Sequence, residues 1–532
     1  MRLFIQQENR YPNPTGVEGA WVLLLNSWND FGYRTLFGLH QEKDGKFQDF
    51  GFVKILKKGQ KGSETPLPEG ELKVGCLPDG YVSLGSDLDY YVRLTSLGKE
   101  ESQGILNALR DISIDTARSE QVEGELGLEV SLHRDHSRPR TFYRDAHATI
   151  ESGGALPGGQ AFSFEFTPGG ADTPITFSFE PIAGAGADFA ETPSHRLVVL
   201  VGRNGVGKTR LLAQLARVAY APPKERDAVA EHGRFEGAPA FPSVVAVSYS
   251  AFDDFEPPSL DGSTNTEVAE QLRMGTGRYA YCGMRDLAEQ LEKPGVQPKL
   301  LSQSEMEWVF GERIGLIRAL DRTKLLAQAL SPVFSEESFR DKLDIEAIDA
   351  LESTGSERNL AILEMFLGDE PTEAFRSLSS GHKIVVHLIA NLTASLKHNG
   401  LALIDEPETH LHPPLLAAMM TGVRRVLRGL RSYAIVATHS PVVAQETLAR
   451  YVLVIESGPY VRGLENETFG ENTGALTREL FGLHTNATDF RRVLNVLIND
   501  LKSIEAIEEH LGSTLSPPSL AYVMARIKGP SE

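Results

Sequence analysis

The chain has 532 residues, a formal net charge of −19 and only two cysteines, Cys76 and Cys282. Two cysteines are too few for a disulfide framework. The negative net charge excludes a surface that is positive throughout and binds DNA without sequence preference. The sequence also excludes a membrane span, because no stretch of it approaches about 18 uninterrupted apolar residues. We therefore expect a cytoplasmic globular protein of roughly two to four domains.

Residues 1–155 are predicted to form a β-rich N-terminal domain. A turn-like sequence at residues 29–32 lies between two apolar runs, as in a hairpin. The glycine- and proline-rich segment 153–170 marks the end of this domain. The expected elements are strands at residues 20–26, 33–40, 51–57 and 80–84 and a helix at residues 102–112.

The most informative segment is residues 196–212, RLVVLVGRNGVGKTRLL, which is typical of a strand, a glycine-rich turn and a helix start. Gly202, Gly207, Lys208 and Thr209 fit the GxxxxGK[ST] phosphate loop. In such a loop the backbone N–H groups close on phosphate oxygens, the lysine reaches the terminal phosphates, and the hydroxyl holds Mg²⁺. The sequence therefore predicts ATP with Mg²⁺ at this loop. The residues assigned to nucleotide binding here are Gly202, Arg203, Asn204, Gly205, Val206, Gly207, Lys208, Thr209 and Arg210.

The rest of the chain divides around this loop. Residues 156–262 are predicted to be the first part of the ATPase core, and residues 263–370 a helical insertion. Pro294, Pro298 and Pro332 divide the insertion, so we expect short helices and not a long coiled coil. Expected core strands are residues 162–166, 175–179, 244–249, 401–404 and 433–437, and the clearest helices are residues 314–330 and 339–351.

Three further motifs follow in the second part of the core, residues 371–460. LALIDEPE places Asp405 and Glu406 at the end of an apolar strand, where one carboxylate can hold Mg²⁺ and the next can activate a water molecule. LSSGHK opens an apolar helix with two hydroxyls and a glycine, a second anion-binding device. His439 follows the strand YAIVA. A single nucleotide would need only one phosphate-binding helix start, yet this chain has two, the phosphate loop and LSSGHK.

These motifs, in this order, resemble the ABC-type ATPases. LSSGHK is similar to their LSGGQ signature, IDEPE to their Walker B strand with its catalytic glutamate, and His439 to their switch histidine. In that family two cores pair head to tail, and each ATP lies between the phosphate loop of one subunit and the signature of the other. The resemblance implies an α/β fold in which a mixed sheet is flanked by helices.

The resemblance also implies roles for individual residues. Thr209 and Asp405 would hold Mg²⁺, Glu406 would be the general base, and His439 would sense the γ-phosphate. The residues that would contact the nucleotide from the other subunit are Ser379, Ser380 and Gly381.

The sequence departs from the transporter members of this family. Their glutamine after the second core strand is missing from VSYSAFDDF, so either Ser250 or Asp253 replaces it or the role is absent. EPETHLHP resembles the branch that contains OLD nucleases, SMC-like proteins and bacterial antiphage ATPases. Residues 28–33 and 279–285 resemble segments of Septu-type and retron-associated defence ATPases.

Other features leave two interpretations open. His410 and His412 form either a metal site or, as we favour, part of an inter-subunit loop. Residues 131–147 gather three histidines and four arginines, which indicates a nucleic-acid patch or, in the favoured interpretation, a solvated basic edge. The helical tail, residues 461–532, packs on the core or docks a partner.

The favoured function is an ATP-hydrolysing switch subunit of a bacterial antiphage defence complex. It would form a head-to-tail dimer or a higher homo-oligomer and control a separate nuclease or toxic effector, with an HNH-type nuclease favoured. Nuclease activity in this chain is doubtful, contact with nucleic acid stays open, and no membrane partner is expected. The alternatives are an SMC-like DNA-repair ATPase and, less favoured, the nucleotide-binding subunit of an ABC transporter.

Overall fold

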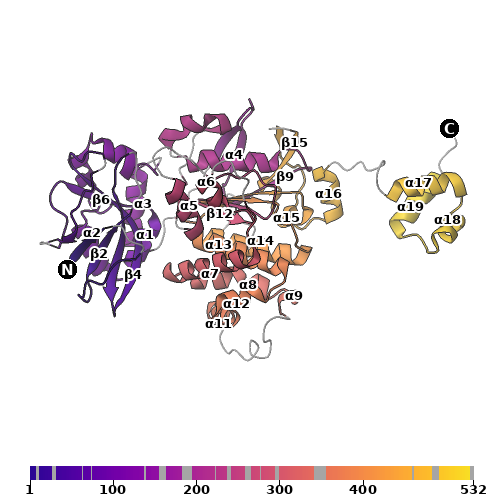
Figure 1. Ribbon diagram of the computed structural model, residues 1–532. Coiled ribbons are helices and arrows are strands. Elements are labelled where there is room, and N and C mark those ends of the chain that lie inside the picture. Colours follow the sequence, from indigo (N-terminus) through magenta and orange to yellow (C-terminus); the bar gives the residue numbers. More distant parts are fainter. Residues whose placement is uncertain are drawn as a thin grey trace. The chain divides into compact units, whose positions relative to one another are not determined.

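The computed structural model describes residues 1–527 of the chain, apart from the gaps given below (Figure 1). The chain divides into two compact units, residues 1–471 and 472–532. Several predicted segments fall outside the described residues: most of the turn at 29–32, much of the boundary segment after residue 154, and the later part of the helix predicted at 339–351. The residues not described within that range are 8–10, 27–31, 63, 73–74, 137–138, 155–162, 182–194, 222, 237–240, 258–264, 276, 294–298, 341–354, 369, 458–459 and 482–489.

The N-terminal domain contains a six-stranded sheet in the order β5-β1-β2-β3-β4-β6. β1 and β2 are parallel, and the other neighbouring pairs are antiparallel. The prediction of strands in this region is confirmed, because each predicted run overlaps a strand. The strands are β1 (Leu3–Gln6), β2 (Trp21–Leu25), β3 (Leu36–Lys43), β4 (Lys46–Lys57), β5 (Gly70–Glu71) and β6 (Tyr81–Gly85).

The second half of this domain, from residue 88 to residue 151, is helical, whereas the sequence predicted a β-rich domain throughout. Asp87 caps the first helix by accepting a hydrogen bond from the amide of Tyr90. Apolar faces of the helices pack against the sheet around Tyr90, Leu94 and Ile105. The helices are α1 (Leu88–Thr95), α2 (Lys99–Ala108), η1 (Thr116–Val122), η2 (Leu128–Leu132) and α3 (Pro139–Glu151).

The predicted ATPase core contains a seven-stranded sheet in the order β12-β11-β13-β14-β9-β15-β16. All neighbours are parallel except the β15–β16 pair. Central strands such as LVVLV and LALID are buried along their whole length, as expected for a parallel sheet covered on both faces. The strands are β9 (Leu197–Val201), β11 (Val244–Ser248), β12 (Tyr279–Gly283), β13 (Leu401–Asp405), β14 (Tyr433–Thr438), β15 (Val452–Ser457) and β16 (Tyr460–Arg462).

A smaller antiparallel sheet, β10-β7-β8, supplies more of the same hydrophobic core. Its β7 (Ser163–Pro168) and β8 (Ile175–Ser178) are the antiparallel pair expected from the sequence, and β10 (Gly233–Glu236) extends it. Phe164, Phe166 and Phe177 of this sheet are buried. The aromatic side chains explain why such short strands hold together.

The region predicted as a helical insertion, residues 263–370, also contains a strand. β12 pairs in parallel with β11 and forms an edge of the core sheet, so the prediction of an insertion that is only helical is wrong. The predicted helix at residues 314–330 is two helices, separated near Asp321, whose φ of 53° cannot continue an α-helix. Pro332 does not divide the region, because it lies inside α8.

The helices of the core surround the sheet and extend away from it (Figure 1). Among the residues that the structure describes, every helix is too short or too polar to cross a lipid bilayer. The helices are α4 (Lys208–Tyr220), η3 (Pro223–His232), α5 (Asn265–Met274), α6 (Leu287–Glu292), α7 (Gln303–Ala319), α8 (Thr323–Phe334), α9 (Glu337–Arg340), α11 (Gly355–Leu367), α12 (Pro371–Arg376), α13 (Ser380–Ser395), α14 (Pro413–Gly429), α15 (Pro441–Gln445) and η4 (Ala449–Tyr451).

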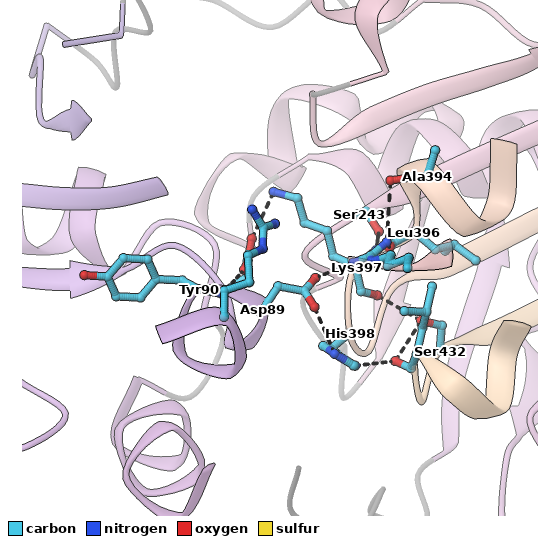
Figure 2. Close-up of polar contacts among 12 residues, drawn as sticks. Asp89, Tyr90, Ser243, Ala394, Leu396, Lys397, His398 and Ser432 are labelled. Carbon is cyan, nitrogen blue, oxygen red and sulfur yellow. Dashed lines mark hydrogen bonds and ion pairs between the residues drawn. The ribbon is translucent and has the colours of Figure 1, made fainter. Parts of the chain in front are cut away.

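A buried ionic cluster joins the N-terminal domain to the end of helix α13 (Figure 2). Oδ1 of Asp89 lies 2.9 Å from Nε2 of His398, and Oδ2 accepts a hydrogen bond of 2.8 Å from Arg322. The same guanidinium donates to the carbonyls of Thr393 and Leu396. Burial alone would raise the pKa of Asp89, but His398 and Arg322 outweigh it and hold that pKa well below its usual range.

The second unit, residues 472–532, has its own small core. Leu494, Ile507 and Val523 are buried against one another. Of the tail predicted to be helical, residues 461–532, the described residues from Thr473 onward form α16 (Thr473–Phe481), α17 (Phe490–Leu501), α18 (Ile504–Leu511) and α19 (Pro517–Ile527), whereas residues 461–472 contain the end of β16 and no helix.

Candidate functional site

The predicted phosphate loop lies between β9 and α4. Gly205 and Gly207 have φ values of 82° and 97°, which a residue with a side chain rarely adopts. Nζ of Lys208 donates to the carbonyls of Gly202 and Arg203 at 2.9 and 3.2 Å. The lysine thus lies over its own loop. Burial is the main cause that lowers its pKa.

Two predicted magnesium ligands meet at the end of β13. Oγ1 of Thr209 donates a hydrogen bond of 2.9 Å to Oδ2 of Asp405, while Oδ1 of Asp405 is buried without a hydrogen-bond partner. Burial raises the pKa of Asp405 to about 7, and the nearby Glu406 adds to this effect. A hydroxyl beside a buried carboxylate with a spare oxygen is a donor set that suits Mg²⁺. These two residues therefore fit the ion that the phosphate loop implies.

Glu406 and His439 come together because β13 and β14 are parallel neighbours. Nδ1 of His439 lies 3.4 Å from Oε1 of Glu406 and 3.0 Å from Oε1 of Glu408. Glu406 has a φ of 45°, an uncommon conformation for a residue other than glycine, which turns the chain sharply after the strand. The residue predicted to be the general base and the predicted switch histidine thus share one edge of the sheet.

Glu408 belongs to this group, although the sequence analysis did not assign it a role. Its Oε1 accepts hydrogen bonds from Oγ1 of Thr438 at 2.7 Å and from the amide of His439 at 2.8 Å. Its side chain is only 10% exposed, and its Oε2 has no hydrogen-bond partner. Glu408 is the third carboxylate of IDEPE, and this position was the signal that the sequence offered. Its contacts with Thr438 and His439 form only when β14 lies beside β13.

The predicted signature residues form the start of α13, beside the loop that follows β13. Ser379 caps the helix, and its Oγ lies 2.9 Å from Nδ1 of His382. A side chain on Gly381 would come within 3.2 Å of the carbonyl of His410. Ser379 and Ser380 are exposed. Among the described residues these three form no hydrogen bond to the phosphate loop.

The two residues considered as replacements for the missing glutamine have other partners. The carboxylate of Asp253 is fully buried, bound by Arg285 at 2.7 Å and by the hydroxyl of Tyr281 at 2.8 Å. Oγ of Ser250 accepts a hydrogen bond from the amide of Phe252. Asp253 therefore anchors the segment after β11 to β12 and does not point a free carboxylate at the nucleotide.

The first part of the histidine- and arginine-rich segment is packed into the structure, whereas Arg140, Arg144 and His147 are exposed, as expected for a solvated basic edge. Asp135 binds Lys54 at 3.1 Å and Arg278 of the core at 3.0 Å. The ring of His136 stacks on Phe142 with centroids 3.8 Å apart, and burial lowers its pKa to about 3. Asp135 thus joins the N-terminal domain to the core.

The loop after β13 ends in a helix cap. Nδ1 of His412 accepts a hydrogen bond from the amide of Leu415 at the start of α14. His410 has a φ of 68° and its carbonyl faces Gly381. The loop therefore contacts the signature helix.

This fold and this arrangement of phosphate loop, Asp405 and Glu406 define an ABC-like P-loop ATPase. Residues 303–444 match the family described as "AAA domain, putative AbiEii toxin, Type IV TA system". The chain belongs to the family of protein ea59 of Escherichia phage lambda: the two are 30% identical over 531 residues, which cover 96% of this chain and 95% of ea59.

Two further similarities are more limited. The Septu protein PtuA of Bacillus thuringiensis is 29% identical over 113 residues, covering 18% of this chain and 28% of PtuA. An ABC transporter of the metal-chelate type, in an inward-facing conformation, aligns with 15% identity and a TM-score of 0.26, covering 60% of this chain and 89% of the transporter chain.

Proposed function

We propose that this protein hydrolyses ATP as a head-to-tail dimer and acts as a switch for a separate nuclease or toxic effector in antiphage defence. One observation carries the dimer: the start of α13 is exposed and makes no hydrogen bond to the phosphate loop of its own chain. A helix N-terminus with exposed serines is suited to bind phosphate oxygens from a second subunit. The short similarity to the Septu protein PtuA supports the defence role.

In this proposal each residue of the site has a defined task. The loop amides and Lys208 hold the phosphates, and Thr209 with Asp405 would hold Mg²⁺. That ion supplies charge neutralisation on the phosphate oxygens. Glu406 accepts the proton of the attacking water, and His439, positioned by Glu408, presents its other ring nitrogen to the γ-phosphate.

The head-to-tail arrangement can be tested by mixing two inactive variants. Lys208→Ala removes the phosphate ligand, and Ser380→Arg places a bulky cation where the partner's nucleotide would lie. A mixed dimer keeps one intact site, composed of the phosphate loop of one variant and the signature of the other. We expect an equimolar mixture to recover about a quarter of wild-type ATP turnover, because half of the dimers are mixed and each has one intact site. Activity of Ser380→Arg alone, or no recovery on mixing, would contradict the arrangement.

The switch function needs a partner and can be tested by co-purification. Glu406→Gln should accumulate the ATP-bound dimer, and Ser380→Arg should not form it. We expect a stoichiometric nuclease-like or toxin-like protein with the first variant in ATP and Mg²⁺, and none with the second. Equal recovery with both variants would refute control by ATP. ATP turnover that rises only when DNA is added would instead favour the SMC-like alternative.

A further inference from the structure

The start of α13 is linked to the short helix α9 through the buried imidazole of His382. His382 lies in the first turn of α13 and is 5% exposed. Its Nδ1 lies 2.9 Å from Oγ of Ser379, and its Nε2 lies 3.0 Å from Oγ of Ser338 on α9. The ring of Phe339, also on α9, packs edge-on against the imidazole with centroids 4.9 Å apart. The imidazole therefore contacts a signature serine through one nitrogen and α9 through the other.

A carboxylate at the far end of this contact fixes where the hydrogens lie. The amide of Ser338 donates to Oε2 of Glu336 at 3.0 Å, and the hydroxyl of Ser338 donates to the same oxygen. A serine hydroxyl has a single hydrogen, so toward His382 it can only accept. The proton of a neutral imidazole is therefore on Nε2, and Nδ1 has a lone pair. Glu336, Ser338 and His382 thus form an ordered chain of hydrogen bonds, which we call the relay.

The relay determines the direction of the Ser379 hydroxyl. Because Nδ1 of His382 is an acceptor, the hydroxyl of Ser379 must donate to it. Oγ of Ser379 also accepts a hydrogen bond of 3.4 Å from the amide of His382, which caps the helix. The only hydroxyl hydrogen is then directed into the chain, although the serine itself is exposed. A phosphate oxygen that approached this hydroxyl would meet lone pairs and no donor.

We propose that His382 is a positioning residue that withholds the Ser379 hydroxyl from the nucleotide of the second subunit until the relay opens. The amides of Ser380 and Gly381 have no acceptor within the first helical turn, so they can bind phosphate while the relay is closed. A movement of α9, which carries Ser338, would open the relay and add the hydrogen bond of Ser379. The inference rests on the proposed head-to-tail dimer and extends it, because it names the element that controls closure around ATP.

The test breaks the relay at two positions in full-length Glu406→Gln protein, which should accumulate the ATP-bound dimer. His382→Phe keeps a ring against Phe339 and removes both nitrogens, so the Ser379 hydroxyl is free to turn. Ser338→Ala removes the acceptor at Nε2, so the imidazole can place its proton on Nδ1 and donate to Ser379. Each protein is titrated with ATP in Mg²⁺, and the dimer is measured by sedimentation velocity. We expect both variants to dimerise at an ATP concentration about tenfold lower or less, the usual effect of one hydrogen bond to a charged group.

Two further substitutions separate positioning from a general structural effect. Ser335→Ala is the matched control, because it removes an exposed serine hydroxyl that donates to the carbonyl of Ser331, outside the relay. It should dimerise like the Glu406→Gln parent. Ser379→Gly costs little as a helix cap and removes the hydroxyl that the relay restrains. In Ser379→Gly protein, His382→Phe should have no further effect, because no hydroxyl remains to be released.

The outcomes distinguish failure of the relay from failure of the dimer. A dimer whose ATP dependence is unchanged in either folded variant, His382→Phe or Ser338→Ala, would overturn the relay alone. A gain that persists in Ser379→Gly protein would also overturn it, since His382 would then act through another group. Absence of a dimer in the Glu406→Gln parent at every ATP concentration would overturn the proposed function and the relay with it. Thermal unfolding identifies a variant that does not fold, in which case the other break in the relay decides.

Discussion

Oε1 of Glu408 holds both the backbone and the ring of His439: it accepts from the amide at 2.8 Å and lies 3.0 Å from Nδ1. A carboxylate beside Nδ1 favours the tautomer with its proton on that nitrogen, which leaves Nε2 free to face a substrate. Glu408 is thus a positioning residue whose effect on ATP turnover would pass through His439.

Glu408→Ala should therefore lower kcat at least tenfold with little change in KM. Thr438 and the amide of His439 would lose a buried acceptor, and each 1.36 kcal/mol of lost transition-state stabilisation is about tenfold in rate. Glu408→Gln keeps an acceptor oxygen and should recover part of that rate. Steady-state kinetics would decide, and equal loss in both variants would point to charge and not to positioning.

Glu406→Gln should bind ATP like wild type but lower kcat by about 10² to 10⁴, the usual contribution of a general base. Glu465→Gln is a suitable control, because it changes an exposed carboxylate. Nucleotide affinity and turnover should be measured on the same preparations. Normal turnover by Glu406→Gln would mean that another group accepts the proton.

Gly202→Ala should weaken both folding and nucleotide binding. An added Cβ would lie 2.6 Å from the carbonyl of Ile455, which is backbone of the neighbouring strand and cannot move aside cheaply. We expect a loss of about 1–3 kcal/mol in the free energy of unfolding. Gly104→Ala, on α2 with open space around it, should be neutral or stabilising by denaturant titration.

Asp89→Asn should destabilise the protein by about 3–5 kcal/mol at pH 7, because it leaves buried Arg322 and His398 without their anion. The pKa of Asp89 is held below its usual range in the folded state, so its stabilisation is present above the unfolded pKa of about 4 and is lost as pH falls below it. The difference between variant and wild type should hence shrink below about pH 4.

Asp79→Asn is the control for that experiment. Asp79 also pairs with an arginine, Arg110 at 2.8 Å, but its side chain is 98% exposed. Such a pair contributes about 0–1 kcal/mol, so this variant should follow wild type at every pH in urea unfolding. A loss as large as that of Asp89→Asn would show that burial is not the cause.

The sequence predicted the site best where function depends on neighbouring residues in the chain. The phosphate loop, Asp405 and Glu406 follow directly from strand ends, and Thr209 does contact Asp405. Glu408 was not assigned because its contacts with Thr438 and His439 exist only when β13 and β14 lie side by side. Local pattern does not specify such a pairing.

The fold predictions were less successful where tertiary contacts outweigh the local pattern. The strand β12 was missed because YAYCG is short and lies between helical segments, and only pairing with β11 makes it a strand. Asp135 was assigned to a solvated edge because Lys54 and Arg278, which form ion pairs with it, are distant in sequence. The helices after residue 88 were underestimated for the same reason.

The cluster around Asp89 determines how this protein could be divided or recombined. The N-terminal domain supplies the only carboxylate recorded within hydrogen-bonding distance of Arg322 and His398 in the described part of the chain. An ATPase core expressed from residue 163 onward would retain both groups and lose their counterion. Exchange of N-terminal domains between relatives should therefore succeed only when the carboxylate and its two partners are transferred as a set.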